Sequence, residues 1–332
     1  MAFANPNYSD ILATTIESRT RQIADNVTNN NAVLQRLSKK GKIRPFSGGH
    51  KILQELSFAE NSNAGYYSGY DLLPVGVSDV ISAAEYDIKQ AAVPVVMSGL
   101  EMLQNSGKER MIDLMQSRLE VAESTLANLI TAGIYSDGTG FGGKEIDGLN
   151  AAVPLDPTAA PYGGIDGATF TFWQNAVSDQ TAAAVTAATI QGFWNGLWAQ
   201  LVRGADRPDL IMVDNVAWET YIASLQAQQR FTNTNTADAG FMSVKFMDAD
   251  VVLDGGIYNG DVTGATGAPA GTAYFLNCNY IHYRPHSARN MVPLSPNRRY
   301  STNQDAEVQI LAWAGNLTTS GRQFQGRFDM NG

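Results

Sequence analysis

Apolar residues recur along the chain at different spacings, and the spacing distinguishes helices from strands. The clearest helical pattern covers residues 106–133. Apolar side chains recur there every three or four positions, at Met111, Met115, Leu119, Ala122, Leu126, Leu129 and Ile130. Ser106 and Glu109 fit a capping box, and Gly133 is typical of a helix end. At about 1.5 Å of rise per residue the helix would be roughly 40 Å long, which is long enough to form the backbone of an elongated molecule.

The N-terminal region predicts two further helices with thin apolar stripes. The first covers residues 9–27, where apolar side chains recur at spacings of four and seven. The asparagines at 29–31 interrupt it. A second, short helix with Val33 and Leu37 is expected to end at Gly41. Stripes this thin indicate an arm that docks on other surfaces.

Residues 45–80 predict a long two-stranded hairpin whose return limb continues into the body of the protein. Its middle, SFAENSNAGYYSGYDLLP at 57–74, is rich in glycine and serine and has no lysine or arginine. The large apolar and aromatic residues of this stretch include Tyr66, Tyr67, Tyr70, Leu72 and Leu73. An isolated two-stranded hairpin is marginally stable in water. These side chains therefore need a partner surface, either on another molecule or on the chain's own body.

The second half of the chain predicts a mixed lobe of helices and strands. Helices are expected at 189–203 and 215–229, with a strand at 209–214 between them. Strands then dominate, at 244–254, 271–283 and 305–314. The fold class is therefore α+β. No period of 20 to 50 residues repeats, which argues against a solenoid or a propeller.

Charge is unevenly distributed along the chain. Residues 11–45 carry seven lysines and arginines against Glu17 and Asp25, a net charge of +5 in a chain whose total is −9. The last five of these cations are Arg36, Lys39, Lys40, Lys42 and Arg44. They would either complement the dipole at the end of the short helix or face a polyanion such as packaged nucleic acid. Base-specific recognition is not predicted, because no zinc spacing, helix-turn-helix or interleaved aromatic pattern is present.

The sequence offers little for catalysis, cofactors or metals. Glycines within 138–143 match the spacing GxGxxG, but they follow a helix and do not connect a strand to a helix. His282 and His286 lack nearby residues that would complete a zinc site. We assign no catalytic, cofactor-binding or metal residue, and we expect a protein that is not an enzyme.

Three aspartates and one cysteine are further candidates for a site. Asp248, Asp250 and Asp254 are spaced so that they could flank a cation, although solubility at strand ends is the commoner role. Cys278 has no disulfide partner and lies in an apolar stretch, so a small buried residue is expected. The N-terminal residues lack a secretory pattern, and no apolar run approaches the ~20 residues that span a bilayer. We expect a soluble protein made inside the cell, with no membrane partner.

The order of these parts resembles the major capsid protein of tailed bacteriophages, which has the Hong Kong 97 fold. The strings that carry the resemblance are DGLNAAVP (147–154), RPDLIMVDNVAWETYIASL (207–225), AYFLNCNYIHYRP (273–285) and AEVQILAWAGNL (306–317). The resemblance covers nearly the whole chain, mostly as architecture. It implies an N-terminal arm at 1–44, an extended E-loop at 45–80, a peripheral domain with a spine helix at 81–150, an axial domain at 151–300, and a return to the peripheral domain at 301–332.

The resemblance also implies a function. Subunits would assemble through homo-pentamers and homo-hexamers into an icosahedral head that encloses viral double-stranded DNA, located in the virion after assembly in the host cytoplasm. Tyr66, Tyr67, Tyr70, Leu72 and Leu73 would contact neighbouring subunits, and the basic residues from Arg36 to Arg44 would face packaged DNA without sequence specificity. The other partners would be a portal, a decoration protein where one is present, and a scaffolding protein. The scaffold would be separate, because the sequence carries no long N-terminal extension.

Some capsid proteins of this family cross-link their shells through a lysine and an asparagine. Residues 52–88 contain no lysine, so this cross-link is not expected here.

Two other functions stay open on the sequence. An encapsulin-like compartment around a protein cargo would have the same fold. A carbohydrate-binding domain or an enzyme would use the tyrosines at 66–70 with Trp194 or Trp198 as an aromatic platform. Glycan binding by a monodisperse monomer would favour that second class.

Overall fold

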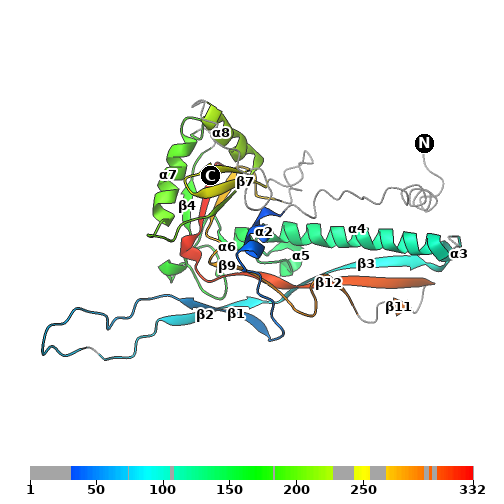
Figure 1. Ribbon diagram of the computed structural model, residues 1–332, viewed down its shortest axis with the longest axis horizontal. Coiled ribbons are helices and arrows are strands. Elements are labelled where there is room, and N and C mark those ends of the chain that lie inside the picture. The colour runs from blue at the N-terminus through cyan, green and yellow to red at the C-terminus, as the bar shows by residue number, and fades with distance from the viewer. Residues whose placement is uncertain are drawn as a thin grey trace.

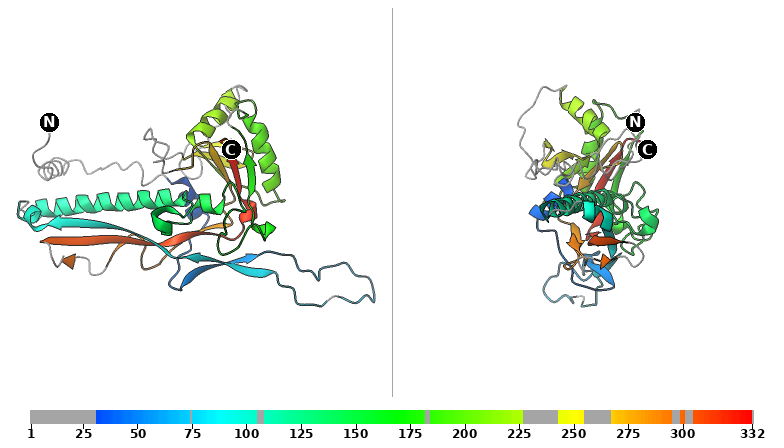
Figure 2. Two further views of the ribbon diagram at one scale, coloured as in Figure 1. Left: turned by 180° about the vertical axis from the view of Figure 1, so that it is seen from behind. Right: turned by 90° about the vertical axis from the view of Figure 1, so that its right-hand side faces the viewer.

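The computed structural model describes residues 31–73, 75–104, 108–181, 184–226, 243–254, 267–294, 299–300 and 305–331. The molecule is elongated, with a long helix extending to one side of a lobe and a hairpin extending to the other (Figure 1). The long helix and the hairpin lie on opposite sides of a long sheet, as the view from behind also shows (Figure 2). No helix in these ranges is both long enough and apolar enough to cross a bilayer.

The long helix α4 (Lys108–Ile134) confirms the strongest helical pattern of the sequence. Ala122, Leu126 and Ile130 recur at spacings of four and are buried against the sheet below. The short helix α3 (Gly99–Gln104) leads into it, and Glu101 accepts a hydrogen bond from Arg118 of α4 at 3.0 Å. Ser106 of the expected cap lies outside the described residues.

One detail of this helix differs from the expectation. Gly133 does not end α4, because the helix continues through Ile134. A Cβ atom at Gly133 would lie 3.0 Å from the side chain of Ile146. The glycine therefore permits a close approach of the following loop. Its role is in packing and not in ending the helix.

The sheet beneath α4 has five strands and is centred on β12. Its strands are β3 (Lys89–Ser98), β9 (Ile281–Pro285), β10 (Val292–Pro293), β11 (Arg299–Tyr300) and β12 (Ala306–Thr319). β12 pairs antiparallel with β3 along one part of its length and with β9 along the rest. It is longer than the strand expected at 305–314, and this length lets one strand join the region under α4 to the lobe.

The lobe is built on a six-stranded sheet in the order β4-β13-β8-β5-β7-β6. The strands are β4 (Ala176–Asp179), β5 (Leu210–Val213), β6 (Ser243–Phe246), β7 (Ala249–Leu253), β8 (Thr272–Leu276) and β13 (Gly326–Asp329). Helices α7 (Ile190–Leu201) and α8 (Asn215–Gln226) cover one face. All four residues of β5 are buried, because its second face joins the core under α4.

Two expected strands are each divided in the structure. The strand expected at 244–254 is a tight hairpin of β6 and β7, with Met247 in a left-handed conformation at φ 53°. The strand expected at 271–283 is β8 and β9, which belong to different sheets. The corner between them is held by Asn277, whose backbone N–H donates to Gln325 at 2.8 Å. Periodicity could not reveal either break, because both halves are apolar.

The N-terminal part that the structure describes begins with α2 (Ala32–Lys39). Asn31 caps it by accepting a hydrogen bond from the backbone of Leu34 at 2.9 Å. Gly41 follows in a left-handed conformation at φ 64°, which confirms the predicted stop. The helix expected at 9–27 lies outside the described residues.

The predicted hairpin is confirmed. β1 (Lys51–Ser57) pairs antiparallel with β2 (Ile81–Asp87), so its paired part extends beyond the expected end at residue 80. Residues 58–80 connect the two strands and are called the tip below; Pro74, within this stretch, lies outside the described residues. The remaining short elements are α5 (Gly140–Gly143), α6 (Leu149–Ala152), η1 (Thr171–Trp173) and η3 (Arg322–Phe324).

Candidate assembly surfaces

The tip projects away from the rest of the molecule (Figure 1). Its large apolar side chains are exposed to solvent. Tyr66 and Tyr70 are fully exposed, and Tyr67 is 66% exposed. Leu72 and Leu73 are exposed beside them, as are Val75 and Val77 further along the tip. These tyrosines therefore do not fold onto the chain's own body. A contiguous run of exposed apolar residues of this kind is typical of an interaction surface.

Local hydrogen bonds organise the tip without burying it. The side chain of Asn63 donates to the backbone carbonyl of Gly76 across the loop at 2.7 Å. The backbone N–H of Ser68 donates to the carboxylate of Asp71 at 2.9 Å, closing a turn around Gly69, whose φ is 54°. These contacts fix the turn and leave the neighbouring aromatic rings free for a partner.

The root of the hairpin, by contrast, is anchored. Ile52, Gln54 and Leu56 of β1 are buried, as are Ala84 and Tyr86 of β2, while the residues that alternate with them are exposed. The hydroxyl of Tyr86 donates to the backbone carbonyl of Thr319 in β12 at 3.2 Å, and burial raises the pKa of that hydroxyl. A fixed root and a projecting tip together form a rigid attachment for a surface that reaches beyond the subunit.

Lys51 lies at the outer face of the root. Its ammonium group is 2.8 Å from the carboxylate of Glu85 on the neighbouring strand. The hydrogen bond and charge of Glu85 raise the pKa of Lys51, and the same contact lowers the pKa of Glu85. Both side chains are largely exposed, so this pair contributes little to stability.

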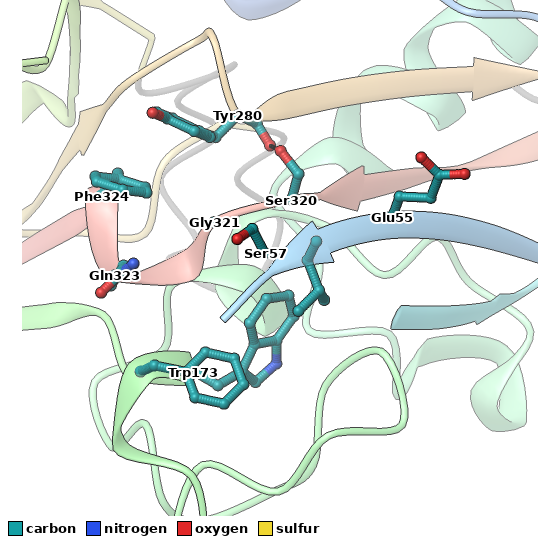
Figure 3. A pocket seen from close by; sticks show the side chains of 10 residues that line it. Glu55, Ser57, Trp173, Tyr280, Ser320, Gly321, Gln323 and Phe324 are labelled. Carbon is teal, nitrogen blue, oxygen red and sulfur yellow. Dashed lines mark hydrogen bonds between the residues drawn. The ribbon is translucent and has the colours of Figure 1, made fainter. Parts of the chain in front are cut away.

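An aromatic recess of about 350 Å³ opens beside the last paired residues of β1 (Figure 3). Tyr280 and Phe324 stack on one side of it with ring centroids 4.1 Å apart. Phe172 and Trp173 form the other side, and Glu55 lies at the rim. The lining is mostly rings and hydroxyl groups, so the recess offers a packing surface rather than a set of reacting groups.

The basic residues expected in the arm divide into two sets. Arg36 of α2 is bound to the lobe, with Nε 3.0 Å from Asp209 and Nη1 3.3 Å from Asp250. Burial works against its charge, but these carboxylates outweigh burial and raise the pKa of Arg36. Lys40 is also 3.0 Å from Asp209. Arg36 and Lys40 therefore fasten α2 to the lobe at the N-terminal ends of β5 and β7.

The other three cations of the set are Lys39, Lys42 and Arg44. No carboxylate of the described residues lies within ion-pair distance of any of them. Lys39 and Arg44 are exposed, and Lys42 is partly buried. These three cations are the ones that remain available for a partner.

The candidate cofactor-binding and metal-binding residues lie apart from one another in the structure. The glycines at 138–143 lie in the turn and short helix after α4, with Gly138 and Gly143 in left-handed conformations. Asp248 pairs with Arg207, and Asp250 pairs with Arg36. Asp254 accepts a hydrogen bond from Tyr135. Across the described ranges, no three histidine, cysteine or acidic side chains gather as a metal site would require.

The cysteine and the two tryptophans that the sequence offers for a site lie in the protein interior. Cys278 is fully buried, as expected, and burial raises the pKa of its thiol. Trp194 is fully buried in the lobe and stacks on Tyr221 with ring centroids 4.6 Å apart. Trp198 is partly buried and packs against Phe246. The aromatic platform considered for carbohydrate binding does not form, because its tryptophans are needed to fill the core.

Comparison with known proteins identifies the fold. No protein-family model matches the sequence, and no curated protein matches it. Among solved structures, the capsid asymmetric unit of cyanophage A-1(L) matches with a TM-score of 0.69 at 15% identity, covering 94% of this chain and 96% of that chain. The capsid of Myoviridae phage XM1 matches with a TM-score of 0.51 at 12% identity, covering 89% and 91%.

A compartment protein matches as well. The holo-SrpI encapsulin complex from Synechococcus elongatus matches with a TM-score of 0.55 at 10% identity, covering 99% of this chain and 96% of that chain. These likenesses show that the chain has the Hong Kong 97-type capsid fold. The expectation of an α+β capsid fold is confirmed.

Proposed function

We propose that this chain is the major capsid protein of a tailed bacteriophage, a structural subunit and not an enzyme. Copies would assemble through pentamers and hexamers into an icosahedral head around double-stranded DNA. The observation that carries this proposal is the projecting tip, whose aromatic and aliphatic side chains are exposed in the single chain. A head-to-tail contact of this kind generates rings when it closes.

The energy available from the tip is large enough to drive assembly. Full burial of one tyrosine removes about 150–250 Å² from water, which corresponds to roughly 4–6 kcal/mol at ~25 cal/mol per Å² before association costs. Tyr66, Tyr67 and Tyr70 would each contribute, with Leu72 and Leu73 beside them. Since every subunit would repeat the contact, even a small part of this energy would hold a shell together.

Further partners belong to the same proposal. Assembly would take place in the host cytoplasm with a separate scaffolding protein and a portal, and the finished head would carry a decoration protein where one is present. Contact with packaged DNA would be electrostatic and independent of sequence. Arg36 and Lys40 are already engaged by carboxylates, so Lys39 is the cation of α2 that supports such a contact.

The test is assembly of purified protein, alone and with its scaffold, followed by electron microscopy. The variant with Tyr66, Tyr67 and Tyr70 replaced by serine should remain a folded monomer and form few shells. The matched variant with the same three positions replaced by phenylalanine keeps the rings and should assemble. Ala64→Ser changes polarity in the same tip without removing a ring, and it should assemble as well. Shell formation by the serine variant at the unmodified yield would contradict the proposal.

A second candidate is a compartment around a protein cargo, which the encapsulin match favours. The contents of particles from the native host separate the two functions. Double-stranded DNA inside supports the phage head, whereas a co-purifying enzyme in DNA-free particles supports the compartment. The cyanophage capsid, with the higher TM-score, is the observation that places the phage head first.

A further inference from the structure

Four basic side chains gather on one face of a strand pair beside the hairpin root. The chain segment after α2 runs parallel to β9, with Ile43 opposite Tyr283. The backbone N–H of Arg44 donates to the carbonyl of Tyr283 at 2.9 Å, and the N–H of Tyr283 donates to the carbonyl of Lys42 at 3.1 Å. Side chains alternate along strands. The residues on either side of Ile43 and of Tyr283 therefore point to the opposite face, where the two segments form one common surface. They are Lys42, Arg44, His282 and Arg284, and we call them the basic block.

Two side-chain nitrogens of the basic block have no hydrogen-bond partner among the described residues. Arg284 donates one hydrogen bond to Gln54 of β1 at 3.3 Å, which places the block against the hairpin root. Its Nε and the Nδ1 of His282 are buried and have no hydrogen-bond partner in the described part of the chain. Buried nitrogens of this kind are normally satisfied. The Nε of Arg284 can only donate, so it lacks an acceptor.

The four side chains of the block differ in their exposure to solvent. His282 is only 4% exposed and forms the floor, Arg284 and Lys42 are partly buried, and Arg44 is exposed. An acceptor that entered from solvent would therefore meet Arg44 first and the more buried groups after it.

The groups of the block also repel one another. Burial, followed by the charges of Arg44, Lys42 and Arg284, lowers the pKa of His282 to about 4. Burial and the nearby charges of Arg44 and Lys40 lower the pKa of Lys42. An anion placed among these groups would relieve the repulsion.

The tip has the opposite arrangement. It carries Glu60, Asp71 and Asp79 and no lysine or arginine. Asp71 accepts a hydrogen bond within its own turn. No cation of the described residues lies within ion-pair distance of Glu60 or Asp79. Glu60 and Asp79 lie at the base of the tip, just beyond the hydrogen bond that Phe58 donates to the carbonyl of Val80 at 3.1 Å. Within the residues that the structure describes, no ion pair joins either carboxylate to the block of the same chain. The tip of one copy thus presents the carboxylates that the basic block of another copy lacks.

We propose that the basic block is a carboxylate-binding site that receives the acidic tip of a neighbouring copy of this chain. The proposal rests on the proposed shell function and names the surface that the tip contacts. Glu60 and Asp79 pair with Arg44, Lys42 and Arg284, and the tip tyrosines pack alongside. Each copy contributes a tip to one neighbour and a block to the other, which is the head-to-tail arrangement that a ring needs.

Charge exchange between the two surfaces tests this site. Lys42→Glu with Arg44→Glu reverses the block, and Glu60→Lys with Asp79→Lys reverses the tip. Each double variant alone should lower the yield of shells at least about tenfold, because like charges would then face each other at every copy of the contact. The quadruple variant, which restores opposite charges, should recover assembly. Lys144→Glu is the matched control, because it reverses an exposed cation outside the block and should assemble normally.

Cross-linking gives a readout that does not depend on shell yield. Arg44→Cys combined with Asp79→Cys should form a disulfide between copies during assembly, visible as a ladder in non-reducing gels. The native Cys278 is buried and should not interfere. Thermal unfolding of each unassembled variant separates loss of the contact from loss of the fold.

The outcomes distinguish failure of the assigned site from failure of the proposed shell function. Failure of the unmodified protein to form particles under any condition would overturn the shell function itself. Normal shells from both double variants, with no disulfide ladder, would overturn only the assigned site. Normal shells that lose packaged DNA when the block is reversed would assign the block to nucleic acid, and this result would also overturn the inference.

Discussion

Asn316 and Asp147 form a reciprocal pair in the interior of the protein. The Asn316 amide donates to the Asp147 carboxylate at 2.7 Å, and the backbone N–H of Asp147 donates to the Asn316 side-chain oxygen at 3.0 Å. The same amide donates to the carbonyl of Asp87 at 2.9 Å, and Asn316 is fully buried. One side chain thus joins β12, the loop after the spine helix and the end of β2.

Replacement of Asn316 by leucine should destabilise the subunit severely. It would remove four hydrogen bonds and leave the backbone N–H of Asp147 without its partner, at a cost of roughly 3 kcal/mol or more. Urea unfolding of the unassembled subunit measures the change. Asn195→Leu on the exposed side of α7 is the control and should change the free energy of unfolding by less than about 0.5 kcal/mol. Equal effects of the two substitutions would contradict the role given to the pair.

Close approach at Gly148 should make even a methyl group costly. A Cβ atom there would lie 2.4 Å from the carbonyl oxygen of Gly133 and 2.5 Å from that of Ile134, at the end of the spine helix. Gly148→Ala should therefore lower stability by about 3 kcal/mol. Gly196→Ala in α7 meets open space, and it should raise stability by about 0.5–1 kcal/mol because alanine is the better helix former. Thermal unfolding of the two variants should show shifts of opposite sign.

Asp254 should make stability depend on pH in an unusual direction. Burial raises the pKa of Asp254 to about 6, and a hydrogen bond from Tyr135 offsets part of that rise. Between pH 4 and pH 6 the folded protein holds a proton that the unfolded chain has released. The contribution of this group is therefore present at acid pH and is lost as the pH rises through about 6.

Asp254→Asn tests that dependence, because it keeps an acceptor for Tyr135 and removes the charge. The variant should gain up to roughly 3 kcal/mol over the unmodified protein at pH 8 and little at pH 4, as measured by urea unfolding across the range. Tyr135→Phe should move the loss of stability to higher pH, because it removes the bond that holds the pKa of Asp254 down. An identical pH profile for all three proteins would disprove the assignment.

Arg36 should hold α2 on the lobe. Arg36→Gln leaves Asp209 without its hydrogen bond from Nε and should cost about 1–3 kcal/mol. Faster amide exchange over Ala32–Lys39 would show the helix loosened, and exchange at the unmodified rate would argue against the contact. Lys39→Gln, on the exposed side of the same helix, should leave the exchange unchanged.

The spine helix and the hairpin follow from local pattern. Alanine and leucine at spacings of four, such as Ala122 and Leu126, can bury only one face, and that face requires a sheet against it. The hairpin follows because Ile52 and Leu56 alternate with polar residues on one side of a glycine-rich loop. In both cases the residues that determine the element lie within a few positions of one another, so sequence spacing is sufficient.

The partners of the charged residues do not follow from the sequence. Arg36 meets Asp209, and Arg44 lies beside Arg284, across very long separations in the chain. The same distance explains why the expected arm divided into residues that bind the lobe and residues that remain available. The prediction of one continuous strand at 271–283 was wrong for the same reason. The corner at Asn277 is stabilised by Gln325, which lies far along the chain.

The sequence by itself determined the α+β class, the spine helix, the projecting tip and its acidic, aromatic composition, because each depends on the properties of neighbouring residues. Only the tertiary structure decided that Trp194 fills a core, that Gly133 accommodates a loop, and that four basic side chains gather at the hairpin root. The physical reason is that burial and charge pairing depend on distance in space, and the chain brings such residues together only after its sheets have formed.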